Sequence, residues 1–225
     1  MKALIIGASR GLGLGLTRQF LARDWQIVAT RRGAAPGLEE AARAHPKALR
    51  LEQVDIDHPA QISALAGRLA GETFDLLFVN AGVSSPHEVP LAKVADAEIS
   101  RVLFTNAINP VRAAEALSGL VGPGGTIGFM TSLLGSIAQC NGGYELYRVS
   151  KTALNMAVMC FGAQAAHKGR TILLLHPGWV RTDMGGPQAP LDIETSTKGL
   201  AETITRHHGK GGIAYLDYQG ETIPW

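Results

Sequence analysis

The sequence is poor in cysteine, in aromatic residues and in excess charge of either sign. Cys140 and Cys160 are its two cysteines, too few for a disulfide framework, so a reducing, cytoplasmic setting is expected. The 21 basic and 19 acidic residues give a net charge of +2, which argues against a nucleic-acid or membrane-surface partner. The first apolar run, Ala3–Ile6, is too short for a secretion signal or a membrane span. The seven histidines lack metal-ligand spacing, so no metal site is expected.

Glycine, by contrast, is abundant. It accounts for 27 of the 225 residues, or 12%, against a usual ~7%. An aromatic fraction of 6% and only 11 prolines exclude a low-complexity or collagen-like chain, so the glycines are expected to serve particular backbone positions. The length suits one full hydrophobic core, and we expect residues 1–225 to form a single domain.

Short apolar runs alternate with longer amphipathic stretches along the whole chain. Runs such as ALIIG, DLLFVN and TILLLH are apolar throughout, which is typical of parallel strands covered on both faces. The alternation predicts an α/β fold: a Rossmann-type, doubly wound, mostly parallel seven-stranded sheet with helices on both faces. Strands are predicted at Lys2–Gly7, Gln26–Arg31, Ala48–Val54, Leu76–Asn80, Thr126–Ser132, Thr171–His176 and Ile213–Asp217. Helices are predicted at Leu12–Arg23, Leu38–Ala44, Pro59–Leu69, Ala97–Leu117, Tyr144–His167 and Thr195–His207.

Two longer connections, Val83–Val94 and Gly185–Glu194, fall at the carboxyl edge of this predicted sheet. Open α/β sheets bind ligands at that edge. The second connection is rich in glycine and proline and is a candidate lid, with an ordinary surface loop as the alternative.

A glycine-rich turn directly follows the first predicted strand and opens the first predicted helix. Glycine permits the tight strand-to-helix turn and the close approach of the backbone to a pyrophosphate, whose charge the helix amino terminus would stabilise. Glycine turns are common, but this position in an alternating βα chain predicts a dinucleotide site. The residues predicted to bind the cofactor here are Gly7, Ser9, Arg10, Gly11, Leu12 and Gly13.

The end of the second predicted strand indicates which dinucleotide is bound. NAD-binding sites place an acidic residue there to bond both ribose hydroxyls, but this chain has Ala29-Thr30-Arg31-Arg32. A guanidinium matches a 2′-phosphate in charge and geometry. We therefore predict NADP(H), with Arg31 and Arg10 approaching the phosphate from two sides, while Arg32 is left out of the site as a solvated loop charge.

The spacing of Tyr147 and Lys151, Y-x-x-x-K, places a phenol and an ammonium on one helix face, one turn apart. A phenol with a pKa near ~10 is a poor acid or base at neutral pH. We expect the ammonium of Lys151 to stabilise the phenolate and so lower the pKa of Tyr147 toward the working range.

The turn G-x-x-x-G-x-G, the Y-x-x-x-K pair and the run P-G-x-V-x-T after the sixth predicted strand together resemble the short-chain dehydrogenase/reductase family. The resemblance extends over nearly the whole chain. It implies a catalytic set of Ser132, Tyr147, Lys151 and Asn106. The implied cofactor contacts outside the glycine turn are Asp55, Ile56, Asn80, Ala81, Gly82, Tyr147, Lys151, Pro177, Gly178, Val180 and Thr182.

Within this set the resemblance assigns roles. Ser132 would bond the substrate carbonyl oxygen, although Ser136 and Thr131 are rivals because the gap to Tyr147 is slightly long. Asn106 would hold a water that relays protons to Lys151, and Asn109 is a competing choice for that role. Asp55 would bond the adenine amino group.

Three further stretches are similar to C-factor and Sniffer-type carbonyl reductases within the family: SLLGSIAQCNGGYELYRVSK, HPGWVRTDMGGP and DYQGETIPW. The implied function is NADP(H)-dependent reduction of small ketones or aldehydes, or oxidation of the alcohols, with Tyr147 as general acid and base. The alternatives are a catalytically idle NADP(H)-binding redox sensor, an epimerase or dehydratase, and a structural interaction protein. The predicted substrate lining is Leu133, Cys140, Tyr144, Trp179 and Met184, and a homo-oligomer (dimer or tetramer) would be built on helices 97–117 and 144–167.

Overall fold

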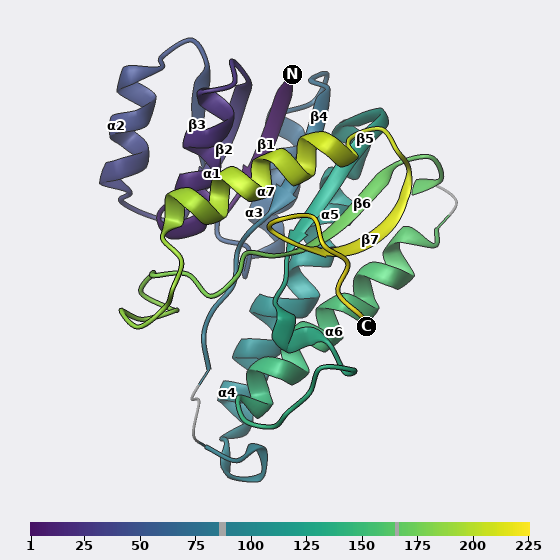
Figure 1. The fold of residues 1–225 in the computed structure, drawn as a ribbon. Coiled ribbons are helices and arrows are strands. Elements are labelled where there is room, and N and C mark those ends of the chain that lie inside the picture. The colour runs from purple at the N-terminus through teal and green to yellow at the C-terminus, as the bar shows by residue number, and fades with distance from the viewer. Residues whose placement is uncertain (86–88, 165–166) are drawn as a thin grey trace.

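The seven strands lie side by side in one sheet, in the order β3-β2-β1-β4-β5-β6-β7 (Figure 1). The computed structural model describes residues 1–85, 89–164 and 167–225, and each strand pair in this part of the chain is parallel. The chain runs outward from β1 to β3 and then returns to the other side of β1. A topological switch point therefore lies between β1 and β4, and the predicted doubly wound α/β sheet is confirmed.

The elements follow the predicted alternation of strand and helix. The strands are β1 (Lys2–Ile6), β2 (Gln26–Arg31), β3 (Leu49–Gln53), β4 (Phe74–Val79), β5 (Val121–Met130), β6 (Thr171–His176) and β7 (Gly212–Asp217). The α-helices are α1 (Gly11–Leu21), α2 (Pro36–Ala44), α3 (Pro59–Arg68), α4 (Asp96–Leu103), α5 (Asn109–Leu117), α6 (Glu145–Gly162) and α7 (Ile193–His207).

Alternate residues of the strands enter two separate hydrophobic cores. Ala3 and Ile5 of β1 face the core formed with α1, α2 and α7, whereas Leu4 and Ile6 face the core formed with α3, α5 and α6. Figure 1 shows α7 crossing one face of the sheet beside α1. Helices α5 and α6 cover the opposite face. Since both faces are covered, the central strands β1, β4 and β6 consist mostly of buried apolar residues, whereas the edge strand β3 carries polar side chains.

The predicted helix Ala97–Leu117 is interrupted by a π-helical turn, Phe104–Ile108, which separates α4 from α5 and is called the π turn below. Pro110, just after the turn, has no N–H to donate and cannot continue a regular α-helical hydrogen-bond ladder. The turn contains Asn106, and π-helical turns are frequent at functional sites.

The predicted helix Tyr144–His167 extends past the carboxyl end of the observed helix α6. Helix α6 ends at Gly162, and residues 165–166 lie outside the described part. Beyond them the ring of His167 packs on that of Phe161, with centroids 3.8 Å apart.

Strand β5 begins five residues earlier than predicted and ends two residues earlier, before Ser132. The strand extends through the Gly-Pro-Gly-Gly run after Val121, and Val121 pairs with Phe74 across a register shift. Four other predicted strands differ by one or two residues at an end, and none changes type.

Of the two longer connections, Val83–Val94 includes residues 86–88, which lie outside the described part. The Gly185–Glu194 connection pairs with the segment after β6 through a bridge between Val180 and Leu191. No helix in the described part of the chain is long and apolar enough to cross a membrane.

Candidate active site

The glycine turn between β1 and α1 packs so closely on the end of β4 that side chains would not fit. Gly7 has a φ of +88°, and a Cβ added there would lie 2.9 Å from the backbone nitrogen of Ala81. A Cβ added at Gly13 would lie 2.1 Å from the carbonyl oxygen of Gly7. Asn80 donates from Nδ2 to that same oxygen at 2.8 Å. The predicted cofactor residues of these two segments therefore form one unit at the switch point.

The amino terminus of α1 is open to an anion. Helix α1 begins at Gly11, and no side chain caps its first turn. The N–H groups there and the helix dipole favour a phosphate. A Cβ at Gly11 would lie 3.8 Å from the methyl group of Thr182, which brings the segment after β6 to the same place. Ser9 and Leu12 are half-buried beside this turn. These residues fit a dinucleotide pyrophosphate.

Both arginines predicted for the 2′-phosphate are paired with carboxylates. Arg31, at the end of β2, forms an ion pair with Glu39 of α2 and donates to the carbonyl oxygen of Gly33 at 3.2 Å. Arg10 forms an ion pair with Asp183, which follows Thr182. The charge that sequence reasoning assigned to a phosphate is therefore partly balanced within the protein.

The loop after β3 carries the residues predicted to contact adenine. Ile56 is buried, and the Asp55 carboxylate accepts a hydrogen bond from the backbone N–H of Asp57 at 3.0 Å. Gln61 holds the backbone of Asp55 at 2.8 Å. The loop is thus ordered by its own contacts.

The segment after β6 is fixed from beneath by α7. Ser196 donates to the carbonyl oxygen of Pro177 at 2.6 Å. Gly178 has a φ of +81°, and a Cβ there would clash with Leu191 at 2.3 Å. Val180 is buried, and Thr182 accepts from the backbone N–H of Gly185 at 3.0 Å. The predicted contacts Pro177, Gly178, Val180 and Thr182 therefore lie on a rigid support.

Tyr147 and Lys151 lie one turn apart on α6, as predicted. The ammonium of Lys151 is 5.7 Å from the centroid of the Tyr147 ring and donates to the carbonyl oxygen of Met130, at the end of β5, at 3.0 Å. Lys151 is buried and Tyr147 half-buried. No carboxylate pairs with Lys151 in the described part, so its only strong acceptor there is a backbone carbonyl.

The expected lowering of the Tyr147 pKa is wrong for this structure. Burial raises the pKa of Tyr147 to about 12. Burial also lowers the pKa of Lys151 to about 8. Desolvation disfavours the charged form of both groups, which sequence spacing alone could not reveal.

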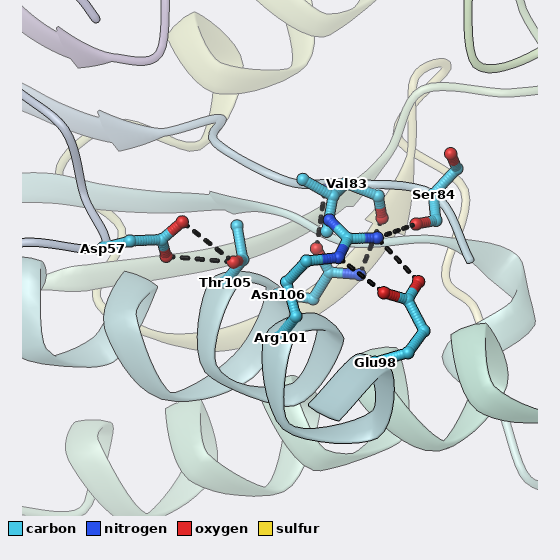
Figure 2. Close-up of polar contacts among 7 residues, drawn as sticks. All are labelled: Asp57, Val83, Ser84, Glu98, Arg101, Thr105 and Asn106. Atoms are coloured by element: carbon cyan, nitrogen blue, oxygen red, sulfur yellow. Dashed lines mark hydrogen bonds and ion pairs between the residues drawn. The ribbon is translucent and has the colours of Figure 1, made fainter. Parts of the chain in front are cut away.

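Asn106 lies in the π turn and is fully buried. Its amide group bonds the backbone of Val83, in the segment that follows β4 (Figure 2). Its Oδ1 accepts from the backbone N–H of Val83 at 2.7 Å, and its Nδ2 donates to the carbonyl oxygen of Val83 at 2.9 Å and to Ser150 Oγ at 3.1 Å. A Cβ added at Gly82 would lie 3.4 Å from Asn106 Oδ1 and 3.6 Å from Lys151 Nζ. The predicted asparagine and lysine thus meet at Gly82.

Ser132 follows β5 and is buried at the start of a short 3-10 turn, where its Oγ accepts from the backbone N–H of Leu134 at 3.2 Å. Tyr215 of β7 donates to its carbonyl oxygen. Both rival hydroxyls are committed to other groups: Thr131 donates to Asn155 at 2.7 Å and Ser136 to the carbonyl oxygen of Pro224 at 2.5 Å. The competing Asn109 likewise donates elsewhere, to Asp57 at 2.9 Å. These contacts favour Ser132 and Asn106 over their rivals.

The predicted substrate lining is only partly brought together. Met184 lies against Tyr147, with its sulfur 3.9 Å from the phenol oxygen. Trp179 is exposed and donates to the carbonyl oxygen of Gly185 at 2.8 Å, in the same loop. Leu133 is half-buried after Ser132, and Cys140 and Tyr144 are exposed before α6. Their role in substrate binding stays a prediction.

Sequence reasoning missed the carboxylates and hydroxyls that organise this edge. Glu39, Asp183, Asp57 and Thr105 each contact a predicted site residue or its neighbour, and Thr30 accepts from the backbone N–H of Gly7 at 3.0 Å. Each contacts a residue of another segment of the chain, and no sequence motif fixes the spacing between the two. Only the charge of Asp183, directly after the predicted Thr182, gave a local signal. In the described residues no group of three or more His, Cys, Asp or Glu could hold a metal ion.

The family model for short chain dehydrogenases matches residues 1–190. C-signal of Myxococcus xanthus is 39% identical over 165 residues, covering 72% of this chain and 99% of C-signal. A Burkholderia multivorans protein solved with bound NADP, named as a short-chain dehydrogenase/reductase, superposes with a TM-score of 0.97 at 43% identity, covering 100% of this chain and 99% of that one. A carbonyl reductase from Pseudomonas aeruginosa PAO1 in complex with NADP gives a TM-score of 0.92 at 37% identity, with the same coverage.

Proposed function

The chain belongs to the short-chain dehydrogenase/reductase family, and we propose that within it the protein reduces small ketones or aldehydes by hydride transfer, with Tyr147 as the general acid. It is an oxidoreductase by family. The observation that carries the proposal is the convergence of Lys151 and Asn106 at Gly82, with Tyr147 one helical turn from Lys151. Such a set serves proton transfer to a developing alkoxide.

The cofactor is NADP(H). Similar proteins of known structure hold NADP, and this chain has the glycine turn, the open amino terminus of α1 and the arginine at the end of β2 that suit it. When bound, NADPH supplies the hydride. We propose that Arg31 and Arg10 bind the 2′-phosphate, in exchange for part of their present pairing with Glu39 and Asp183.

Each catalytic side chain has a separate task in this proposal. Ser132 holds the carbonyl oxygen by a hydrogen bond, and Tyr147 donates its proton to that oxygen. The ammonium of Lys151 stabilises the phenolate left on Tyr147. Asn106 supports the relay that returns a proton to Lys151, as family resemblance implies. Met184 lies beside the Tyr147 phenol, with its sulfur 3.9 Å from the phenol oxygen.

The protonation state of Tyr147 suits a proton donor. Since burial raises the pKa of Tyr147 to about 12, the phenol carries its proton throughout the physiological range. A protonated phenol is ready to act as an acid. We therefore propose that Tyr147 donates its proton in carbonyl reduction.

The test is loss of NADPH absorbance with a panel of activated aldehydes and ketones, run beside Tyr147→Phe. The wild type should turn over, and the variant should lose roughly a hundredfold to ten-thousandfold in kcat while its Kd for NADPH stays unchanged. Equal activity of the variant would contradict the role of Tyr147. Tight NADPH binding by the wild type with no turnover of any carbonyl would favour the idle redox sensor.

We propose that residues 1–225 act as one domain and associate as a homo-oligomer. All strands in the described part join one sheet. Apolar side chains are exposed on the π turn and α6, the region expected to pair with a second copy; they are Phe104, Ile108, Val149, Met156 and Met159. Sedimentation of the wild type and of Met156→Glu tests the association.

A further inference from the structure

Asp57 reaches the π turn from a distant part of the sequence (Figure 2). The hydroxyl of Thr105 lies within hydrogen-bond distance of both Asp57 carboxylate oxygens, at 2.9 and 3.1 Å. Asn109 donates from Nδ2 to the same carboxylate at 2.9 Å. Because Thr105 lies inside the π turn and Asn109 directly follows it, one carboxylate joins the two ends of the turn.

The π turn needs such support. π-helical turns are rare, and Pro110 has no N–H to donate to the carbonyl groups of the turn before it. Thr105 and Asn109 are both buried, so the Thr105 hydroxyl and the Asn109 Nδ2 group need acceptors within the protein. Asp57 provides partners for both donors.

Asn106 is next to Thr105 in this turn, and its position depends on the turn. Its amide holds the N–H and the carbonyl of Val83, while Arg101 of α4 donates to the carbonyl oxygen of the next residue, Ser84, at 3.2 Å and is itself fixed by Glu98 (Figure 2). Movement of the turn would displace Asn106 relative to Gly82 and Lys151.

We propose that Asp57 is a positioning residue that staples the π turn and thereby fixes Asn106 for the proton relay. Asp57 lies two residues after Asp55, and the two are joined by a hydrogen bond of 3.0 Å. The staple thus links the loop predicted to contact adenine with the catalytic asparagine. This inference rests on the proposed function for the role of Asn106, but the mechanical link from Asp57 to Val83 does not.

The test uses the full-length protein and substitutions at Thr105, the buried end of the staple. Thr105→Val keeps the shape of the side chain and removes the hydroxyl, whereas Thr105→Ser keeps the hydroxyl. Glu115→Ala, on the exposed face of α5, is the matched control. Hydrogen–deuterium exchange at the backbone N–H of Val83, which Asn106 holds, reports the position of Asn106 without any turnover.

We expect Thr105→Val to raise the exchange rate at Val83 by about tenfold or more. Its kcat for carbonyl reduction should fall about tenfold while the KM for NADPH changes by less than about threefold, because proton transfer depends on geometry. Thr105→Ser should restore both, and Glu115→Ala should change neither. Asp57→Ala should reproduce Thr105→Val.

Unchanged exchange at Val83 in Thr105→Val would overturn the inference, and so would faster exchange with an unaltered kcat. A wild type that turns over no carbonyl would refute the proposed function instead. In that case the exchange rate at Val83 still decides whether Asp57 and Thr105 hold Asn106 in place.

Discussion

The ammonium of Lys151 lies 5.7 Å from the centre of the Tyr147 ring, and burial shifts the pKa values of the two groups in opposite directions. The pKa of Lys151 falls to about 8 and that of Tyr147 rises to about 12. Near neutral pH the pair therefore consists of an ammonium and a protonated phenol. This is the combination that a proton donor needs.

The pH dependence of kcat should report Lys151. Above pH 8 the ammonium loses its proton and no longer stabilises the phenolate formed on Tyr147, so kcat for carbonyl reduction should fall by about tenfold per pH unit. Lys151→Arg keeps a positive charge at every accessible pH. Its kcat should be lower at pH 7, since the guanidinium is larger, but the fall above pH 8 should vanish. A wild-type kcat that stays flat from pH 7 to about 10 would contradict this assignment.

Cofactor selectivity should depend on the pair Arg31–Glu39. Glu39→Gln removes the carboxylate that balances Arg31, so the Kd for NADPH should fall by up to about fivefold while that for NADH stays constant. Arg31→Ala should raise the Kd for NADPH about tenfold or more, since a charge-assisted hydrogen bond is lost. Protein fluorescence titrations with both cofactors measure these constants. Glu40→Gln, an exposed neighbour on α2, is the control, and an equal shift for NADH would argue against 2′-phosphate recognition.

Stability should decrease on mild acidification because of His176. Burial lowers the pKa of His176 to about 4, against the weaker opposing effect of Asp217, and Nδ1 has no hydrogen-bond partner in the described part. The unfolded chain therefore binds more protons than the folded chain between pH 6.5 and 4. The contribution of His176 is complete above pH 6.5 and is lost as the pH falls, by roughly 1.4 kcal/mol per pH unit in that window.

Urea unfolding at pH 7 and pH 5 measures this dependence. His176→Gln cannot titrate, so its free energy of unfolding should fall less over the same interval. His167, whose pKa burial also lowers, will contribute a residual slope in both proteins. An identical pH dependence for wild type and His176→Gln would rule His176 out as the source.

The glycine turn should tolerate no methyl group at Gly13. Gly13→Ala would place a Cβ 2.1 Å from the carbonyl oxygen of Gly7, and relief of that clash requires backbone movement in the cofactor turn. We expect a loss of roughly 1–3 kcal/mol in the free energy of unfolding, together with weaker NADPH binding. Gly33→Ala is the control, since a Cβ there meets no atom within 4 Å, and it should change stability by less than about 1 kcal/mol. Equal behaviour of the two variants would show that the turn can open.

The order of elements could be predicted from the sequence because it depends on local composition. Strands such as β6 carry a continuous apolar run, Ile172–Leu175, and the amphipathic stretches between the strands have helical periodicity. The exceptions lie beside local features: β5 includes the Gly-Pro-Gly-Gly run, and Pro110 lies just after the interruption of a predicted helix. Element ends were less accurate because neighbouring segments decide where pairing stops.

The residues of the candidate site also fall into two groups, those that local sequence spacing predicts and those that only the tertiary structure brings together. Gly7, Gly13, Tyr147 and Lys151 belong to fixed spacings within one turn or one helix, so the sequence by itself determined them and the edge of the sheet on which they lie. Tertiary structure alone decided the partners of the arginines, the π turn and the reach of Asp57 to Thr105, since those contacts join residues far apart in the chain. It also decided the direction in which the Tyr147 pKa moves. The cost of burying a charge depends on the whole surroundings of a group, and no local spacing records it.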